Sequence, residues 1–319
     1  MRLACVGNAL IDIIAHVEPD FPCSIGVHPG STEHVERPVL AYVLEALADY
    51  GFSAGGGAAN TARAFTALGG KASFTGAIGD DDWGRRYKED LERAGVSAFL
   101  QRHEGFTGLF LSLCDSSGQR SIMVNPGVAD RLTPSMMPDS IFSKKSVLYI
   151  DGFLALDEGM LEYLVAKAKA AAMPIAFDAG GQRLVRANRE LFMHIICEDA
   201  TWAFLNEDEF VALAEVSVDA SLASFAMGIA GTLVVKRGET GAVCIKDGQL
   251  YESSVRALEG LDTTGAGDAF AAGFLKASLS GAPLARCMRM GNWTAEHAIQ
   301  VPGLALDADG LCKGMSAFL

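Results

Sequence analysis

The chain lacks the cysteine and histidine patterns that mark disulfide-rich and zinc-binding proteins. Its seven cysteines are scattered, their number is odd, and no C-x-x-C pair occurs. The six histidines form no H-x-x-x-H pair. We therefore expect neither a disulfide framework nor a zinc site, and we predict reduced, mostly buried thiols.

Positive charge and long apolar runs are also scarce. The 26 Lys and Arg residues face 39 Asp and Glu residues, so the net charge is −13, and no basic stripe runs along the chain. This balance argues against a nucleic-acid partner and against a membrane surface. No apolar stretch reaches the ~18 residues of a membrane span, and Gly7, Asn8 and Asp12 interrupt the apolar N-terminus. The sequence predicts a cytoplasmic protein.

Two standard nucleotide-binding motifs are absent. A P-loop fails because Gly70-Lys71 is followed by Ala72. The dinucleotide fingerprint fails twice, since "GGGAAN" ends in Asn60 and "GAGDAF" ends in Phe270. A nicotinamide-dependent dehydrogenase is therefore disfavoured, and a bound phosphate group must be held in another way.

The segments that are present alternate between two kinds. Strand-like runs such as "SVLYIDG", "IAFDAG" and "TWAFLN" are followed by helix-like runs and short loops. This alternation predicts a three-layer α/β/α sandwich with a mostly parallel central sheet. Ligands bind such sheets at the carboxyl ends of the strands, where we expect Asp12, Asn206, Gly238 and the loop before Asp268.

Two stretches lack this alternation. Residues 97–125 include a strand, an Asp-Ser-Ser-Gly turn and a second strand, and residues 12–46 show no clear helix over most of their length. We predict that they pair into a small β-sheet outside the main domain. The main domain would then comprise residues 1–11, 47–96 and 126–319.

The stretch "LDTTGAGDAFAAGF", residues 261–274, carries the most chemistry. Gly265, Ala266 and Gly267 have little or no side chain and precede a helix, so their N–H groups can form an anion hole. Asp268 stands beside them and could take a proton from an acceptor hydroxyl during phosphoryl transfer. Taken alone, it could equally be a charge that complements the helix N-terminus.

The same stretch closely resembles the C-terminal signature of the PfkB family of carbohydrate kinases, in the ribokinase-like superfamily. "GGGAANTARAFTALG", residues 55–69, resembles the family's N-terminal signature. The resemblance implies an ATP-dependent phosphotransferase in which Asp268 is the catalytic base and Gly265, Ala266 and Gly267 are the anion hole. It also implies that the small sheet is a lid that excludes water.

The resemblance extends to the nucleotide and to metal ions. "NEDE" is similar to the family's N-x-x-E motif, in which Asn206 and Glu209 would help hold Mg²⁺ and the ATP phosphates through water; a plain helix N-cap is the other interpretation. "KRGETG" and "GNWTAEHAIQVPG" resemble the turn that contacts the nucleotide and the segment beside the adenine. The implied ATP-binding residues are Lys236, Gly238, Gly241 and Asn292. The positions comparable to a monovalent-cation (K⁺) site are Asp262, Thr264, Ala298, Val301 and Gly303.

On the acceptor side, Asp12 in "GNALID" matches the aspartate that accepts from sugar hydroxyls. Gly56, Gly57 and Asn60 match the glycine-rich acceptor loop, and "YIDGF" places Asp151 at another acceptor-facing strand end.

The sequence departs from ribokinase, which has a lysine where this chain has Gly57. "GNALIDI", "GGGAANT" and "YIDGF" are more similar to the adenosine-kinase-like and unassigned sugar or nucleoside branches. Arg120 could reach the acceptor or be a solvated hairpin charge, and Phe106, Phe110 and Phe153 could stack on a base or pack the core.

We therefore expect transfer of the γ-phosphoryl group of ATP to a primary hydroxyl of a small-molecule sugar. A nucleoside kinase is the alternative, and a non-catalytic sugar or nucleoside sensor with the same fold is the rival from another class. An exposed small sheet would also suit a homodimer joined through the lid.

Overall fold

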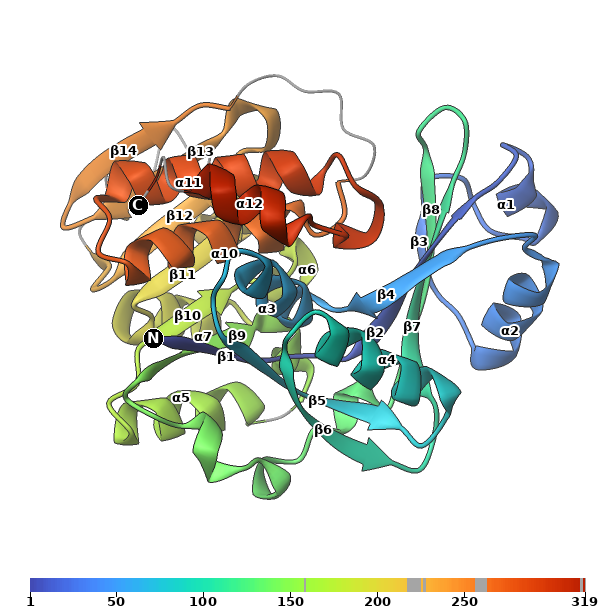
Figure 1. Cartoon of the computed structure of the whole chain (residues 1–319), viewed down its shortest axis with the longest axis horizontal. Coiled ribbons are helices and arrows are strands. Elements are labelled where there is room, and N and C mark those ends of the chain that lie inside the picture. Colours follow the sequence, from blue (N-terminus) through green and yellow to red (C-terminus); the bar gives the residue numbers. More distant parts are fainter. Residues whose placement is uncertain (158, 217–224, 226–227, 256–262, 316–317, 319) are drawn as a thin grey trace.

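The computed structural model describes residues 1–157, 159–216, 225, 228–255, 263–315 and 318. Its main body is built on a nine-stranded sheet in the order β14-β13-β12-β11-β10-β9-β1-β5-β6 (Figure 1). All neighbours from β12 to β6 pair in parallel, whereas β13 and β14 add an antiparallel edge. The strands are β1 (Arg2–Val6), β5 (Ala72–Gly79), β6 (Ser97–His103), β9 (Ser146–Asp151), β10 (Ile175–Asp178), β11 (Trp202–Asn206), β12 (Thr232–Lys236), β13 (Ala242–Lys246) and β14 (Gln249–Ser253).

The inner strands are apolar because both of their faces are covered. In β1, Leu3 and Cys5 belong to one buried cluster, while Ala4 and Val6 belong to a second cluster on the opposite face. Near-continuous apolar strands of this kind are typical of parallel sheets packed between helices. The three-layer α/β/α sandwich expected from the sequence is therefore confirmed.

Helices cover both faces of this sheet (Figure 1). On one face α10 packs against α3 and α11, and α12 packs against α3. The opposite face carries the other group, whose side chains share the second cluster. The first group is α3 (Gly57–Ala67), α4 (Asp82–Arg93), α10 (Ala266–Leu279), α11 (Leu284–Ala298) and α12 (Ala308–Gly314), and the second is α5 (Met160–Ala170), α6 (Gln182–Ala187), α7 (Arg189–His194) and α8 (Glu207–Ala214).

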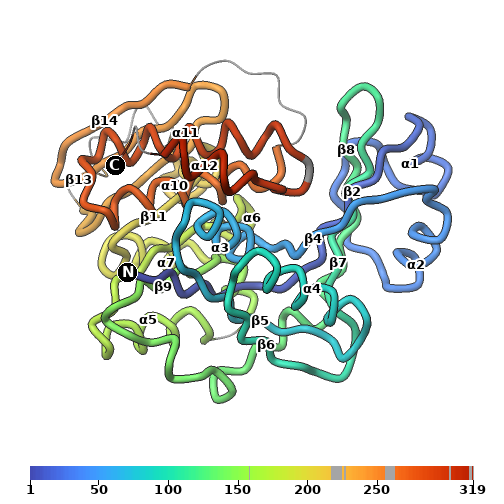
Figure 2. The backbone as a smooth tube through the Cα atoms, in the orientation of Figure 1, coloured from blue at the N-terminus to red at the C-terminus, as the bar shows by residue number. Residues whose placement is uncertain are grey.

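A five-stranded sheet stands beside the main body, in the order β3-β8-β7-β2-β4. Figure 2 shows the chain running from β1 directly into β2, so the two sheets are joined from the first residues onward. Its strands are β2 (Leu10–His16), β3 (Thr32–His34), β4 (Gly51–Gly55), β7 (Thr107–Cys114) and β8 (Arg120–Gly127), accompanied by the helices α1 (Phe21–Ser24) and α2 (Arg37–Ala46).

Two strands lie in a different sheet from the one expected. Residues 97–103 were expected in the small sheet, but β6 pairs in parallel with β5 from Ser97 to His103. Residues 51–55 were expected in the main domain, but β4 pairs with β2 of the small sheet. The first error has a physical cause, because β5, α4 and β6 form a crossover unit that returns the chain to the same sheet.

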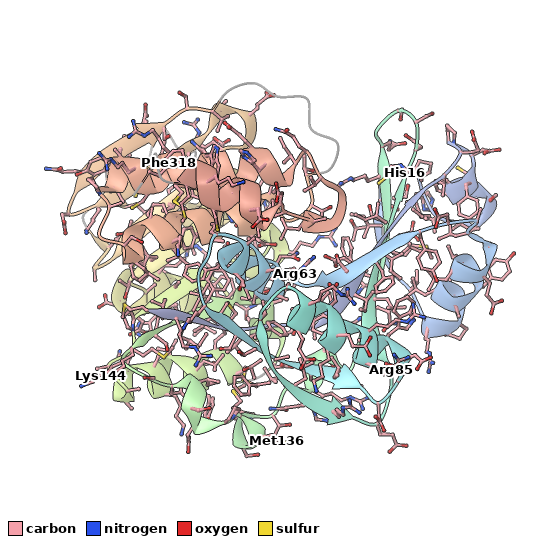
Figure 3. All side chains as sticks on the ribbon, in the orientation of Figure 1. His16, Arg63, Arg85, Met136, Lys144 and Phe318 are labelled. Carbon is pink, nitrogen blue, oxygen red and sulfur yellow. The ribbon has the colours of Figure 1, made fainter. Side chains whose placement is uncertain are left out.

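The edge strand β4 is tied to the main body by side chains from α3 and α4. Ala54 N donates to Asp90 Oδ2 at 2.8 Å, and Arg63 donates to the carbonyl of Ala54 at 2.9 Å. Tyr87 Oη donates to the carbonyl of Gly55 at 2.9 Å. Figure 3 shows Arg63 at this junction.

Among the described residues, no helix combines the length and apolar character needed to span a bilayer.

Candidate active site

Three adjoining cavities open along the carboxyl ends of the main strands. The helix cavity, of about 350 Å³, lies between α10, α11 and the β12–β13 turn. The central cavity, of about 270 Å³, lies above the ends of β9, β10 and β12. The small-sheet cavity, of about 190 Å³, is bounded by β2, β7 and the start of α3. Asp268 lines both the central and the small-sheet cavity and so stands where they meet.

The loop before Asp268 has the geometry of an anion hole. Gly265 is the N-cap of α10 and has a φ of 73°, which favours glycine. Ala266 and Gly267 follow in the first turn, where the N–H groups of a helix have no intrahelical acceptor, and Ala266 N donates at 3.2 Å to the Thr263 carbonyl just before the helix. The helix dipole adds partial positive charge at this end. These residues can therefore bind an anionic group beside the Asp268 carboxyl.

Asp268 is in an environment that opposes its charge. Burial raises the pKa of Asp268 to about 8, and the nearby carboxylates of Asp178 and Asp151 add to the shift. Lys236 and Asn60 lower the pKa in part. A carboxyl group with a raised pKa is a stronger base once it has lost its proton, which suits proton abstraction from a hydroxyl.

The small-sheet cavity combines a polar end with an apolar wall. Asp12 and Asn60 lie at the polar end, while Leu10, Phe110 and Phe153 provide the apolar lining. Burial raises the pKa of Asp12 to about 6, although Arg63 and a hydrogen bond from Asn60 lower it in part.

Asp12 had been expected at the carboxyl end of a main-sheet strand. The structure instead places it within β2 of the small sheet. A Cβ on Gly55 would lie 2.0 Å from Asp12 Cγ, so only glycine leaves room for the carboxyl there. The neighbouring Gly56 has a φ of 90°, and Gly57 lines both this and the central cavity. Asn8 Oδ1 is buried at the same cavity and has no hydrogen-bond partner among the described residues.

Asp151 joins two walls of the site. Its Oδ1 accepts from Phe153 N at 3.0 Å, and its Oδ2 accepts from Ala58 N at 3.4 Å. Burial raises the pKa of Asp151 to about 6, the Phe153 hydrogen bond lowers it in part, and Asp178 raises it further. The carboxyl therefore fixes the glycine loop relative to the aromatic side chain of Phe153.

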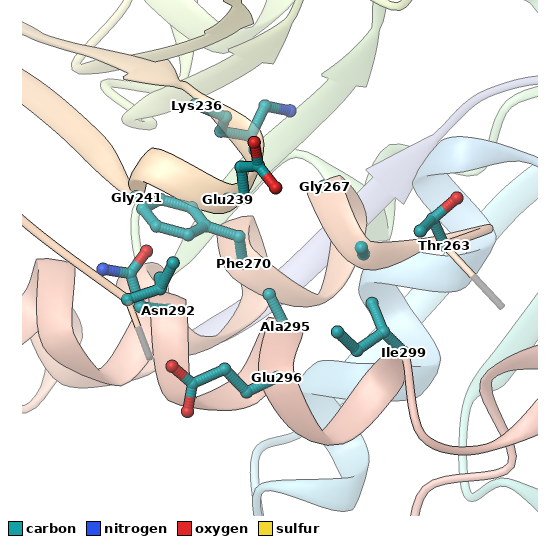
Figure 4. Close-up of a pocket in the computed structure, with 13 residues that line it drawn as sticks. Lys236, Glu239, Gly241, Thr263, Gly267, Phe270, Asn292, Ala295, Glu296 and Ile299 are labelled. Carbon is teal, nitrogen blue, oxygen red and sulfur yellow. The ribbon is translucent and has the colours of Figure 1, made fainter. Parts of the chain in front are cut away.

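The helix cavity is largely apolar, and Figure 4 shows the side chains that line it. Phe270, Ala295 and Ile299 form its sides, and Lys236 lies at its inner end. Gly238 and Gly241 also line it. Asn292 also lines it, but its Nδ2 already donates to Ser253 O at 3.2 Å and to Ser253 Oγ at 3.1 Å, which ties α11 to β14.

Asn206 and Glu209 form a capping box at the start of α8. Glu209 N donates to Asn206 Oδ1 at 2.8 Å, and Asn206 N donates to Glu209 Oε2 at 2.7 Å. The N-cap interpretation is therefore confirmed. Glu209 also lines the central cavity, where burial and the charge of Asp178 raise its pKa to about 7.

Sequence reasoning missed Asp178 and left the role of Arg120 open. Asp178 ends β10 and pairs with Lys236 Nζ at 2.9 Å through Oδ2. Its only sequence signal is a polar residue at the carboxyl end of a buried strand. Arg120, at the start of β8, donates to Thr264 Oγ1 at 2.9 Å, so the small sheet reaches across to the anion-hole loop.

The residues predicted to hold metal ions lie in different surroundings. Among the described residues, no group of three or more His, Cys, Asp and Glu side chains could ligate a metal ion directly. Asp262 lies outside the described residues, and Ala298 ends α11. Val301 and Gly303 follow α11, and the Gly303 carbonyl already accepts from Ser53 Oγ and Arg63, both at 3.4 Å.

Comparison with known proteins identifies relatives over nearly the whole chain. The sequence pattern of the pfkB family carbohydrate kinases matches residues 2–309. An uncharacterized sugar kinase of Archaeoglobus fulgidus is 30% identical over 240 residues, covering 74% of this chain and 94% of that protein. The ATP-dependent ribose-1-phosphate kinase of Halopiger xanaduensis is 29% identical over 242 residues, covering 75% and 78%. The crystal structure of adenosine kinase from Sinorhizobium meliloti superposes with a TM-score of 0.87 at 26% identity, covering 100% of this chain and 99% of that one.

Proposed function

Because the chain belongs to the pfkB family of carbohydrate kinases and is an ATP-dependent sugar or nucleoside kinase, we propose that its acceptor is a nucleoside. The γ-phosphoryl group of ATP would be transferred to the primary hydroxyl of the ribose. The observation that carries the proposal is the small-sheet cavity, whose polar end at Asp12 and Asn60 faces an apolar wall.

The two ends of this cavity suit the two parts of a nucleoside. The Asp12 carboxylate can accept from adjacent ribose hydroxyls, and Asn60 can donate and accept. Phe110 and Phe153 offer faces on which a base can stack, whereas a free sugar would leave much of this apolar surface without a partner.

Asp268 would act as the general base. It takes the proton of the primary hydroxyl while the acceptor oxygen forms its bond to the γ-phosphorus, and the electron pair of the broken bond leaves with ADP. The N–H groups at the start of α10 stabilise the charge on the migrating group. Arg120, donating to Thr264, would hold the small sheet over the site as a lid and exclude water.

The donor set around the central cavity suits a divalent cation bound with the phosphates. Asp178, Glu209 and Asp268 bring three carboxyl groups to this cavity, and their oxygens could hold a Mg²⁺ ion through water. When bound, Mg²⁺ would neutralise charge on the phosphates.

A monovalent cation fits less well. The Gly303 carbonyl that would face it already accepts from the Arg63 guanidinium, so we derive no role for K⁺. A homodimer through the small sheet remains a prediction, which light scattering can check.

The test is ADP release by the purified protein with ATP and Mg²⁺, across nucleosides, pentoses, hexoses and keto-deoxy acids. We expect turnover with a nucleoside, loss of turnover when EDTA removes Mg²⁺, and a decrease in kcat of at least ~100-fold in Asp268→Asn. Asp309→Asn is the matched control, since it removes a carboxylate from the first turn of α12, outside the three cavities.

Each outcome has a distinct meaning. Turnover confined to free sugars would refute the nucleoside acceptor. Binding of a nucleoside without ADP release would indicate the sensor. Full activity of Asp268→Asn would remove the proposed base.

A further inference from the structure

Lys236 lies between the helix cavity and the central cavity and lines both. It ends β12, and only 15% of its side chain is exposed. A Cβ on Gly267 would lie 3.1 Å from Lys236 Nζ. In Figure 4 the amine points toward the Gly267 end of the cavity and away from Asn292. The ammonium group is therefore adjacent to the first turn of α10, where a phosphate group would be bound.

Asp178 holds the lysine in this position. Its Oδ2 lies 2.9 Å from Lys236 Nζ, and only 11% of its side chain is exposed. The carboxylate is itself fixed, because Oδ1 accepts from Gly180 N at 3.1 Å and Oδ2 accepts from Tyr149 Oη at 3.4 Å. A charge pair as buried as this contributes little net stability on average, so stability alone does not account for it well.

The charges around the pair are unbalanced. The lining of the central cavity includes one lysine and four carboxyl groups, which belong to Asp151, Asp178, Glu209 and Asp268. Burial would lower the pKa of Lys236, but Asp178, Glu209 and Asp268 together raise it above its ordinary value. The lysine therefore stays charged. Its ammonium group is the positive charge in this lining that can interact with an incoming phosphate.

We propose that Lys236 is a further catalytic residue of the kinase reaction, whose ammonium group passes from Asp178 to the transferring phosphoryl group, and that Asp178 is its positioning residue. The inference rests on the proposed phosphoryl transfer. Lys236 gives up no proton in the step. The proton of the acceptor hydroxyl goes to Asp268, the acceptor oxygen bonds to phosphorus, and the broken bond's electron pair goes to ADP.

A cation that acts on the moving group should affect turnover more than substrate binding. Preorganised charge at the transferring group is worth about 100-fold or more in rate per group removed. The nucleotide would still be held by the rest of the helix cavity, and the acceptor by the small-sheet cavity. A purely structural ion pair would instead change stability and leave the turnover of the folded protein nearly unchanged.

The experiment compares four single variants and the double variant Lys236→Met with Asp178→Asn in the ADP-release assay, at saturating ATP and varied acceptor concentration. Lys236→Met removes the charge at similar length, Lys236→Arg keeps it, and Asp178→Asn removes the partner. The matched control is Lys169→Met, which breaks the ion pair of another lysine with a buried carboxylate, that of Asp199, away from the three cavities. Lys236→Gln replaces Lys236→Met if the latter does not fold.

We expect Lys236→Met to lower kcat about 100-fold with the acceptor KM within roughly threefold, and Lys236→Arg to recover about tenfold of the loss. Asp178→Asn should lower kcat about tenfold, and the double variant should be no worse than Lys236→Met alone, since Asp178 acts through the lysine. Lys169→Met should keep the parental kcat.

Two failures can be told apart. If no acceptor supports ADP release by the unmodified protein, the proposed function fails. If the protein turns over, Asp268→Asn is inactive, and Lys236→Met or Lys236→Gln keeps kcat within roughly threefold, the lysine proposal alone is overturned. Additive losses in the double variant would overturn the positioning role of Asp178.

Discussion

Replacing Asp268 by asparagine should increase stability while abolishing turnover, and the increase should depend on pH. The pKa of Asp268 is raised from 3.8 to about 8, chiefly by burial, so the folded protein holds a proton that the unfolded chain releases. The carboxyl group's contribution is therefore most favourable below the unfolded pKa near 4 and is lost progressively up to pH 8. Asparagine cannot ionise, so the variant avoids this loss.

The size of the effect follows from the shift. A change of about 4 pKa units corresponds to about 6 kcal/mol at most. Asp268 is only half-buried, however, so water screens part of the penalty, and we expect about 2 kcal/mol near pH 8. For a chain of 319 residues, that is an increase in Tm of about 3 °C.

The assay is thermal unfolding of the protein without nucleotide, from pH 5 to pH 9, for the parent, Asp268→Asn and the control Asp309→Asn. The difference in Tm between Asp268→Asn and the parent should grow with pH and level off above pH 8. The control, with an exposed carboxylate, should show no such growth. A difference that is constant with pH, or a less stable Asp268→Asn, would refute the environment inferred for Asp268.

Three further substitutions test the walls of the small-sheet cavity. Gly55→Ala introduces a methyl group 2.0 Å from Asp12 Cγ, so the acceptor KM measured by ADP release should rise about tenfold while the ATP KM stays unchanged. Phe153→Ala should raise the nucleoside KM about tenfold, whereas Leu156→Ala, an exposed residue of the same short helix, should not. Arg120→Ala removes the bond from the small sheet to the anion-hole loop, so phosphate released without acceptor should increase relative to phosphorylated product. Equal KM values for Phe153→Ala and Leu156→Ala, or an unchanged product ratio for Arg120→Ala, would contradict these roles.

The fold could be read from the sequence because local patterns determine it. Apolar strands such as "SVLYID" and the glycine stops of the helices predicted the layers, and the structure has them. The sheet membership of residues 51–55 and 97–103 could not be read in this way. Both are short extended segments, and their partners are set by a crossover in one case and by the α3 and α4 side chains around Ala54 in the other.

The candidate site was predictable where glycine is indispensable. Gly265 and the pair Gly55 and Gly56 stand out in the sequence because Gly265 and Gly56 have a positive φ and a Cβ on Gly55 would collide with Asp12. Asp178 has no comparable sequence signature. Its role arises from β12, which is separated from β10 by β11 and whose last residue, Lys236, pairs with Asp178. Strand order of this kind is not written in any local pattern.

The charge balance of the central cavity also explains why the base and the cation must be considered together. Burial and the carboxylates of Asp178 and Asp151 oppose the ionisation of Asp268, so positive charge in the cavity favours the loss of its proton near neutral pH. Lys236 lowers the pKa of Asp268 even while it is paired with Asp178. Removing the Lys236 charge should therefore raise the pKa of Asp268 further, in addition to removing positive charge from the transferring phosphoryl group. The base and the cation act together for this reason.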